Sequence, residues 1–149
     1  MQKRQKFILI RFTVVIIVTV VAVVAMISFK DWVNRSESML AMDSLGKVIL
    51  KYRAENGSVP PESHVNSIRT NLPGNARLGD LFRYRALWLS FDSPPDTILA
   101  YAKKRYRSLI LKDGVIVLKL NGRVEWLDMK DFETLLTKQQ SSLEKQMQK

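Results

Sequence analysis

The sequence has no cysteine, and its 149 residues include a single histidine, His64. The lack of cysteine excludes disulfides, thiol catalysis, and zinc or iron–sulfur sites with cysteine ligands. His64 follows Pro60-Pro61 in a polar stretch, so we expect an exposed loop residue rather than one member of a Ser-His-Asp set. The sequence also lacks a glycine-rich phosphate loop and a paired-carboxylate site. We therefore expect no enzyme activity, no catalytic residues, no metal site and no cofactor.

Acidic residues are scarce as well: there are 14, against 24 basic residues, and the formal net charge is +10. No acidic residue precedes the apolar run that begins at Phe12, whereas four basic residues do: Lys3, Arg4, Lys6 and Arg11. No recognised nucleic-acid module accompanies this charge, so we do not expect nucleic acid as a partner. The basic start adjoins an apolar run, so we interpret its charge as the flank of that run.

The apolar run covers residues 12–29, eighteen positions without a charge. A bilayer core of about 30 Å requires roughly 20 apolar residues in a helix, and Phe7–Ile10 add to the run if Arg11 extends its guanidinium toward the headgroups. The basic flank places the N-terminus in the cytoplasm. A cleaved export signal is the alternative, but the run is long for one, and the small residues Ala22 and Ala25 lie inside it. The sequence predicts a single-pass protein of the inner membrane, with lipid as its first partner.

A helical pattern continues beyond the run. The apolar residues recur at spacings of three and four and form one face: Met42, Leu45, Ile49 and Tyr52. Asn56-Gly57 suits a left-handed helix end, and Pro60-Pro61 cannot continue a helix. We therefore expect one helix over 12–54, about 65 Å long, half in the bilayer and half outside. Gly46 is its one poor helix former.

The rest of the chain predicts a small antiparallel sheet. Residues 62–96 are irregular, and we expect mostly loop with one short helix or strand. Strands are predicted over 97–102, 108–112, 115–120 and 123–127. Asp113-Gly114 and Asn121-Gly122 are typical of two-residue type I′ turns.

These turns set the expected register. Val117 lies opposite both Ile110 and Trp126, and Val124 lies opposite Lys119. The strand over 115–120 is apolar on both faces, so we expect it to be central and Trp126 to lie in the core. The long helix covers one face, and the pattern does not indicate what covers the other.

A short C-terminal helix follows. Asp128 is a candidate N-cap, and Phe132, Leu135 and Leu136 give one apolar face. The fold class is thus α+β: a long N-terminal helix, a small antiparallel sheet and a short C-terminal helix. The predicted parts are a basic cytoplasmic segment over 1–11, a transmembrane helix over 12–29, an extracytoplasmic domain over 30–136 and a polar, disordered tail over 137–149.

Two motifs within this order of elements resemble type IV pilin-like proteins, and most closely the major pseudopilins of bacterial type II secretion systems. The helix-end motif Tyr-x-x-x-Asn-Gly-x-x-Pro is matched at Tyr52, Asn56, Gly57 and Pro60. A C-terminal ending of pseudopilin-like proteins is matched at Asn121, Gly122, Arg123, Val124, Glu125 and Trp126. The resemblance implies a pilin-like extracytoplasmic domain, a role in protein transport, and pseudopilin or other secretion-system subunits as partners.

The chain departs from the family at two positions that the resemblance assigns to processing and assembly. Family precursors carry glycine before the phenylalanine that becomes the mature N-terminus, and here Arg11 precedes Phe12. The family's glutamate, five residues into the mature chain, is replaced by Ile16. We therefore expect an uncut chain that begins at Met1 or Gln2 and does not form a filament by itself, although homo-oligomers stay open. A stand-alone anchored binding module is the alternative function.

Two minor alternatives concern charged residues. Some major pseudopilins bind calcium near their C-terminal end, and the resemblance makes four carboxylates candidates here: Asp113, Asp128, Asp131 and Glu133. Each of them also has a local role as a turn former, a cap or a first-turn acid. The basic cluster over 103–107 suits either an anionic headgroup or an acidic partner, or else protects a strand edge from pairing.

Overall fold

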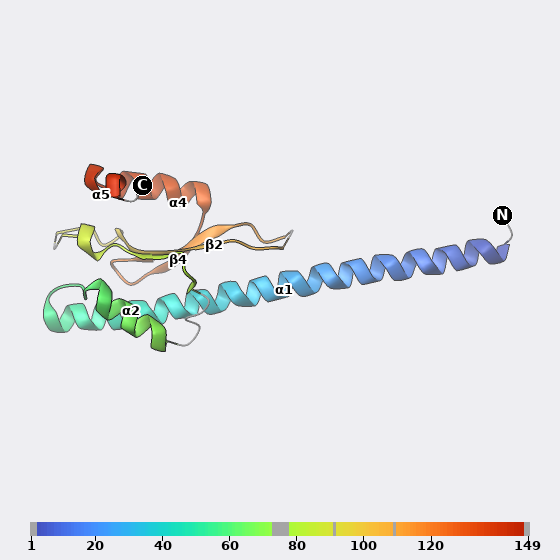
Figure 1. Cartoon of the computed structure of the whole chain (residues 1–149), viewed down its shortest axis with the longest axis horizontal. Helices are drawn as coiled ribbons and strands as arrows, with labels where there is room; N and C mark the ends of the chain where they lie inside the picture. The colour runs from blue at the N-terminus through green and yellow to red at the C-terminus, as the bar shows by residue number, and fades with distance from the viewer. Residues whose placement is uncertain (1–2, 73–77, 91, 109, 148–149) are drawn as a thin grey trace.

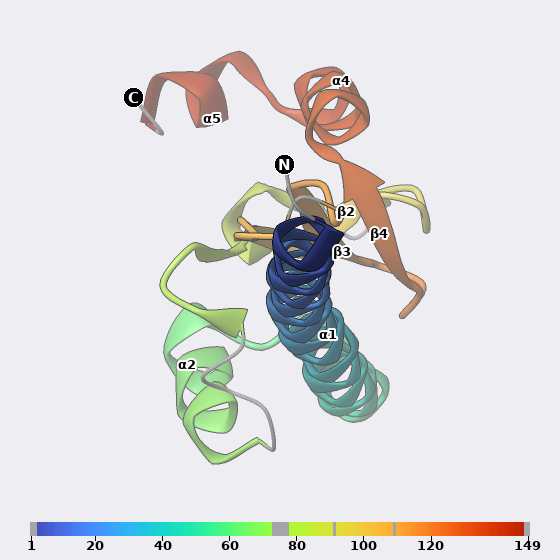
Figure 2. The same cartoon turned by 90° about the vertical axis from the view of Figure 1, so that its right-hand side faces the viewer.

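The computed structural model describes residues 3–72, 78–90, 92–108 and 110–147. The fold is α+β, as predicted, with a four-stranded antiparallel sheet between two helical layers. Figure 1 shows the long helix α1 below the sheet with α2 beside it, and α4 and α5 above the sheet. The N-terminal half of α1 extends far beyond this layered domain. Figure 2 looks along α1 from its N-terminal end, with α2 on one side of the helix and α4 and α5 beyond the sheet.

The helix α1 runs from Lys3 to Asn56 without a break. Its 54 residues span about 81 Å, and the predicted continuity across the end of the apolar run is confirmed. Gly57 ends the helix at a φ of 73°, and its N–H donates to the Arg53 carbonyl at 2.8 Å. The expected left-handed helix end at Asn56-Gly57 is therefore present.

The sheet consists of β1 (Phe82–Tyr84), β2 (Ile98–Lys104), β3 (Gly114–Lys119) and β4 (Val124–Asp128), in the order β1-β2-β3-β4. The strand β3 lies between two neighbours, as its two apolar faces predicted.

The strand predicted over 108–112 is wrong, because β2 itself pairs with β3 and the chain over 105–113 connects them. Gly114 is not part of a turn, since it pairs with Lys104 inside the ladder. The Asp113 carboxylate accepts the Tyr106 N–H at 2.7 Å and holds the connection in a wider loop. Leu109 lies outside the described residues.

The turn between β3 and β4 is one residue longer than predicted. Gly122 has a φ of 85°, and Asn121 does not adopt a positive φ. The Gly122 N–H donates to the Lys119 carbonyl, and the Lys119 N–H donates to the Arg123 carbonyl. This is the hydrogen-bonding pattern of a three-residue loop with glycine at its left-handed position, rather than a type I′ turn.

The longer turn moves the register by one residue. Val124 pairs with Leu118 rather than Lys119, and Trp126 pairs with Ile116 rather than Val117. A one-residue shift moves a side chain to the opposite face of a sheet. Trp126 therefore packs on the α1 side, where it is half-buried instead of fully inside the core.

Each face of the sheet has its own core. On one face the buried side of α1, including Met42, Leu45 and Ile49, packs with residues such as Ile116 and Leu118. The opposite face is covered by α4 (Met129–Gln139), whose residues Phe132 and Leu136 pack on four residues of the two central strands: Ile98, Tyr101, Val115 and Val117. The short amphipathic helix predicted after Asp128 is thus the cover that the sequence pattern left unassigned.

Two other segments contain more structure than predicted. Residues 62–96 form α2 (Glu62–Asn71), β1 and the 3-10 turn η1 (Ala86–Trp88). The tail over 137–149 is not disordered over its described part, because α4 extends to Gln139 and α5 (Ser142–Met147) follows. Glu144 in α5 is fully buried, and the ion pair that it forms explains the order of this polar segment.

Candidate functional site

The candidate functional site is the exposed half of α1. Its large apolar side chains between Phe7 and Phe29 are 41–73% exposed, except Val24, which is half-buried. None of its most apolar eighteen-residue window is buried in the structure. By length and composition α1 is a candidate membrane span, and a membrane would remove this apolar surface from water.

The two threonine hydroxyls in this half are satisfied within the helix itself. The Thr13 hydroxyl donates to the Leu9 carbonyl at 2.9 Å, and the Thr19 hydroxyl donates to the Val15 carbonyl at 2.8 Å. Such internal bonds are what a helix requires in a solvent that offers no partners. The Arg11 guanidinium lies 4.6 Å from the centre of the Phe7 ring, which directs its charge toward the N-terminal end.

The two departures from the pilin pattern lie in the same half. Arg11 is exposed, and Ile16 is 50% exposed. Phe12, which follows Arg11, is 66% exposed, and its spacing of four from Ile16 places these two on one face of the helix. Between Lys3 and Lys30 the helix carries no acidic side chain. A neighbouring chain that approaches this face therefore meets apolar side chains and no carboxylate.

The end of the exposed half is marked by contacts with the connection between β2 and β3. Ser108 donates its backbone N–H to the Asp31 carboxylate at 2.8 Å, and its hydroxyl shares a hydrogen bond with the Ser28 hydroxyl at 2.9 Å. Trp32 remains 59% exposed and stacks on Phe29 at 6.3 Å. The level of residues 28–32 is therefore where the apolar half meets the domain.

The helix-end motif closes the other end of α1. The Asn56 side chain donates to the Tyr52 carbonyl at 3.0 Å. Pro60 is buried, and its carbonyl accepts the Tyr84 hydroxyl at 2.8 Å. Burial, together with the nearby Tyr52, raises the pKa of the Tyr84 phenol, which keeps it neutral as the donor. The motif ties the helix end to β1, and its matched residues act in the fold.

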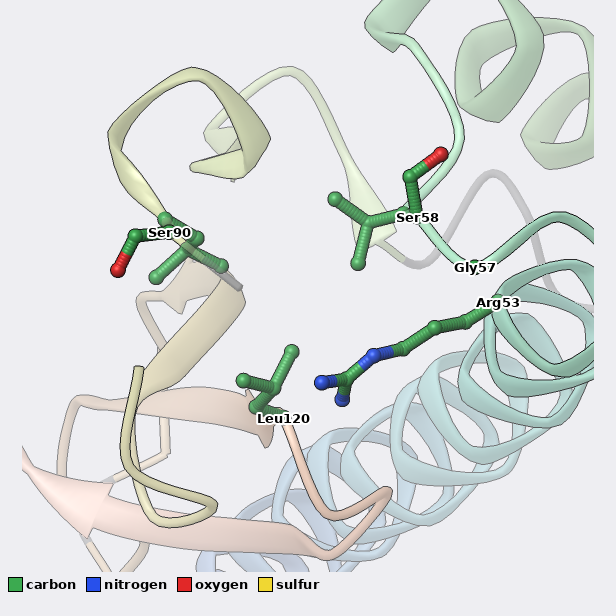
Figure 3. Close-up of a pocket in the computed structure, with 7 residues that line it drawn as sticks. Arg53, Gly57, Ser58, Ser90 and Leu120 are labelled. Atoms are coloured by element: carbon green, nitrogen blue, oxygen red, sulfur yellow. The ribbon is translucent and has the colours of Figure 1, made fainter. Parts of the chain in front are cut away.

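Figure 3 shows a cavity beside this helix end, into which Arg53 points between Gly57 and Leu120. Its volume is about 110 Å³, well below the roughly 300–1,000 Å³ of small-molecule sites. His64 lies nearby on α2, where it is exposed and its ring is 5.2 Å from that of Tyr52. The expected loop position of His64 is wrong, but its expected exposure is confirmed.

The C-terminal motif forms the β3–β4 turn and strand β4. The Asn121 side chain accepts the Arg123 N–H at 3.0 Å and donates to Asp96 at 3.2 Å. Glu125 forms an ion pair with Lys119 at 2.8 Å. These contacts hold the turn and the first part of β4, while Val124 is half-buried against the α1 side of the sheet.

Trp126 is the centre of an aromatic and charged stack at the α1 boundary. The Arg35 guanidinium lies 4.2 Å from the centre of the Trp126 ring, and the Tyr106 ring stacks on Trp126 at 5.7 Å. The stack joins α1, the β2–β3 connection and β4 close to the Ser108–Asp31 contact. Motif residue Trp126 thereby helps to hold the domain against the helix.

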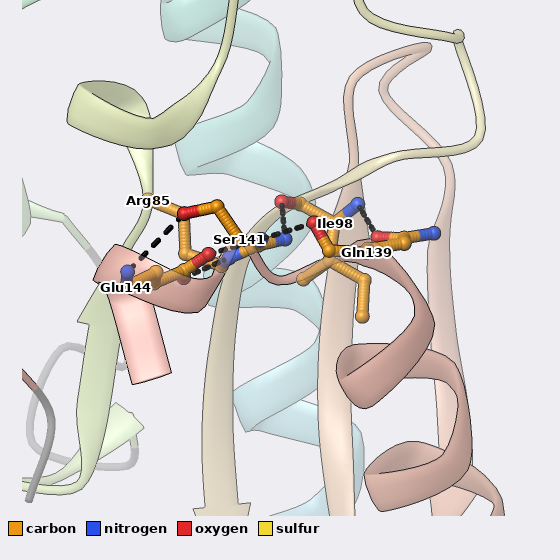
Figure 4. A network of polar contacts seen from close by, with 5 residues as sticks. All are labelled: Arg85, Ile98, Gln139, Ser141 and Glu144. Atoms are coloured by element: carbon orange, nitrogen blue, oxygen red, sulfur yellow. Dashed lines mark hydrogen bonds and ion pairs between the residues drawn. The ribbon is translucent and has the colours of Figure 1, made fainter. Parts of the chain in front are cut away.

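Sequence reasoning missed a buried ion pair between Arg85 and Glu144, drawn in Figure 4. Two guanidinium nitrogens of Arg85 donate to the two carboxylate oxygens of Glu144 at 2.7 and 2.8 Å. Arg85 also donates to the Ile98 carbonyl at 2.8 Å, and the Gln139 side chain accepts the Ile98 N–H at 2.8 Å. The two partners are 59 positions apart, so no local pattern signals the pair.

The carboxylates considered for calcium have separate surroundings. Asp113 accepts a hydrogen bond from the loop, and Asp128 is the residue before α4 without a side-chain cap bond. Asp131 and Glu133 are exposed on α4. Over the part of the chain that the structure describes, no three histidine, aspartate or glutamate side chains form a group able to hold a metal ion.

Comparisons of the chain with protein-family models, with curated proteins and with solved structures give no significant match.

Proposed function

We propose that this chain is a single-pass protein of the inner membrane, with the N-terminus in the cytoplasm and the domain on the outer side. The observation that supports the anchor is the apolar half of α1, in whose most apolar eighteen-residue window no residue is buried. The basic residues Lys3, Arg4, Lys6 and Arg11 precede the span and favour this orientation. A reporter that works only outside the cytoplasm, fused to Lys149, should be active. An inactive fusion, with a cytoplasmic reporter active at the same position, would contradict the proposed orientation.

The proposed role is that of a non-enzymatic, pseudopilin-like component of a secretion or pilus-type system, which acts by packing its helix against related subunits. Support comes from one uninterrupted helix that supplies both the apolar span and the core of the outer domain. The helix-end contacts add to this support, since Asn56 and Gly57 close the end of α1 and the Tyr84 hydroxyl of β1 donates to the Pro60 carbonyl just beyond it. A partner that binds the membrane-spanning half of α1 would therefore also position the outer domain.

The alternative role is a stand-alone anchored binding module. The observation that favours it is the pair of departures at Arg11 and Ile16, both on the exposed half. Arginine is bulky and charged at a place where a peptidase for pilin precursors meets glycine. In both roles the N-terminal peptide should begin at Met1 or Gln2 by mass spectrometry. A mature chain that begins at Phe12 would instead restore processing of the ordinary pilin kind.

Photo-crosslinking in native membranes separates the two roles. A photoreactive residue is placed at each position over 12–29 in turn, and the adducts are identified by mass spectrometry. Packing against related subunits predicts adducts with pseudopilins, or with copies of this chain, that recur every three or four positions along one helix face. If every position gives lipid adducts alone, the stand-alone role is correct.

A further inference from the structure

The connection between β2 and β3 carries exposed basic side chains at the point where the exposed half of α1 ends. Its described residues, 105–108 and 110–113, are here named the boundary loop. Figure 1 shows that the corresponding end of the sheet points along α1 toward the N-terminal half. Ser108 of the loop bonds to Ser28 and Asp31 of α1 at 2.9 and 2.8 Å. The loop therefore lies at the level of the helix where the apolar run over 12–29 finishes.

Side chains in the first half of the boundary loop alternate between inward and outward positions. Tyr106 is half-buried against Trp126, and Ser108 is half-buried against α1. Arg105 and Arg107, which lie between them in sequence, are exposed. The inward residues fix the loop to the domain, and both arginines are consequently held on its outer side.

The tip of the loop is a tight turn around the Ser108 hydroxyl, which accepts the N–H groups of Ile110 and Leu111 at 3.1 and 3.3 Å. This turn presents Ile110 with 70% of its surface exposed. Lys112 follows and is exposed as well. An exposed isoleucine between basic residues is the combination that suits a polar and anionic bilayer surface, where the apolar tip enters the headgroup layer.

Helix α1 adds to the same surface. Lys30 is exposed directly after the apolar run, and Trp32 is exposed where an interfacial aromatic residue is expected. Four exposed basic residues, Lys30, Arg105, Arg107 and Lys112, lie around the boundary together with two carboxylates, Asp31 and Asp113. Both carboxylates accept hydrogen bonds from backbone N–H groups of the boundary loop, and Asp31 is half-buried.

We propose that the boundary loop is a second membrane contact, which binds anionic phospholipid headgroups on the outer side of the bilayer that α1 spans. This inference rests on the proposed membrane span. Charged headgroups attract basic residues held within a Debye length of about 8–10 Å, and each such residue near the surface favours binding roughly fivefold. Loop and helix then hold the membrane at two points, which limits the tilt of the domain on its anchor.

The absence of cysteine from the chain makes the test clean, because a single introduced cysteine takes a label at one site only. Ile110→Cys carries an environment-sensitive fluorophore in the full chain, reconstituted into vesicles of phosphatidylcholine alone or mixed with phosphatidylglycerol. Lipids that carry a quencher on the headgroup report contact. We expect strong quenching at position 110 in the anionic vesicles, weak quenching in phosphatidylcholine alone, and loss of the difference at high salt.

Matched substitutions identify the basic residues responsible. Arg105→Gln with Arg107→Gln should lower the ratio of docked to undocked loop roughly 25-fold, fivefold for each lost charge. Lys138→Gln with Lys145→Gln removes the same charge from the last turn of α4 and from α5, at the end of the domain farthest from the exposed half (Figure 1). This control should change the ratio less than about twofold, because those charges lie outside the screening length of the surface.

A label at Val18→Cys separates the two proposals. If the label at position 18 reports an aqueous environment, the membrane span itself is wrong. If position 18 reports hydrocarbon while position 110 responds neither to anionic lipid nor to the two arginine substitutions, the span stands and the lipid contact is overturned. Quenching at position 110 that is equal in both vesicle types would also overturn it, since a headgroup charge is then not what binds.

Discussion

At the residue scale, the ion pair between Arg85 and Glu144 holds the C-terminal helix α5 against the rest of the domain. Both side chains are fully buried, with 1% and 0% of their surface exposed. The guanidinium also donates to the carbonyls of Ile98 and Gln139, so the charge has partners on several sides. A buried ion pair gains little net energy relative to apolar residues, but removal of one partner is costly. The pair therefore holds α5 on the sheet chiefly because its separation would leave a buried charge.

Glu144→Ala should lower the free energy of unfolding by roughly 3–5 kcal/mol, because Arg85 stays buried without its carboxylate. Urea unfolding of the full chain in mild detergent, followed by tryptophan fluorescence, measures this loss. Glu133→Ala, an exposed glutamate on α4, is the matched control and should change stability by less than about 0.5 kcal/mol. The double variant Arg85→Met/Glu144→Leu should recover most of the loss, and a double variant no more stable than Glu144→Ala would show that charge is not the cause.

Tyr106 makes the stability of the fold depend on pH in the alkaline range. Burial, with Asp31 and Asp113 nearby and against the opposing effect of Arg35, raises the pKa of the Tyr106 phenol to about 12. The unfolded chain loses this proton near pH 10. The ionisation of Tyr106 therefore leaves the free energy of unfolding unchanged below about pH 10 and lowers it as the pH rises toward 12. Tyr106→Phe should reduce the decline of stability across that interval, and an unchanged slope would contradict the assignment.

The same substitution should be neutral or slightly stabilising at pH 7. Within the described residues the buried hydroxyl of Tyr106 has no hydrogen-bond partner, so its removal abolishes a cost rather than a bond. Tyr84→Phe is the matched comparison, because the Tyr84 hydroxyl donates to Pro60. That variant should lose about 1 kcal/mol at pH 7. Equal losses in both variants would show that the Tyr106 hydroxyl does have a partner.

At the element scale, α1 serves two environments with one continuous set of backbone hydrogen bonds. Its first fully buried residue is Ser38, well after the apolar run, and the packing surface extends from there to Ile49. Gly46 lies in the middle of that surface, where a β-carbon would come within 2.7 Å of a Leu118 methyl carbon. The poor helix former is thus explained by the close approach of helix and sheet.

Gly46→Val should destabilise the domain by about 1–3 kcal/mol, because added methyl groups overpack the contact with Leu118. Ala54→Val, at an exposed position of the same helix, introduces the same side chain without the contact and should cost less than about 1 kcal/mol. Both are measured by urea unfolding. Adding Leu118→Ala to Gly46→Val should cost less than Leu118→Ala does alone. A cost that is fully additive would mean that the two residues do not compete for space.

At the scale of the whole molecule, the chain consists of the exposed apolar half of α1, here called the rod, and a layered domain that packs on the other half of the same helix. The core residues on α1 begin at Ser38 and the exposed apolar run ends at Phe29. The two parts are therefore separated by less than three helical turns. Among the described residues, a hydrogen bond between Ser28 and Ser108 links the run to the boundary loop. The domain core does not depend on the rod.

A chain that begins at Lys30 should therefore fold, stay soluble without detergent and unfold cooperatively. Loss of the Ser28–Ser108 bond should cost about 1 kcal/mol. A chain that ends at Gln140 is the informative counterpart, since it keeps both cores but removes Glu144, and it should lose at least as much stability as Glu144→Ala. Urea unfolding compares the two truncated chains. If the chain that begins at Lys30 fails to fold while the chain that ends at Gln140 keeps its full stability, the domain depends on the apolar half of α1, contrary to this prediction.

Local pattern was sufficient for the features that depend on local chemistry. The continuous helix follows from the absence of breakers before Gly57, its end follows from the freedom of glycine at a φ of 73°, and the helix after Asp128 follows from the spacing of Phe132 and Leu136. The α+β class and the central position of β3 follow from the same period-two and period-three-to-four patterns. The candidate membrane span follows from the long apolar run, which needs no tertiary partner to be recognised.

Tertiary structure alone decided the features that depend on distant contacts. Asn121-Gly122 suits two turn types that differ by one residue, and the structure has the longer one, which places Trp126 on the α1 face of the sheet. Asp113 fits both a tight turn and a side-chain bond to Tyr106, and the pairing of β2 with β3 selects the second. The polar tail has no apolar pattern of its own, so its order comes from Arg85, which lies 59 residues away from Glu144. Short-range periodicity does not predict such pairings, because the two partners are far apart in sequence and stabilise the fold only after the chain has brought them into contact.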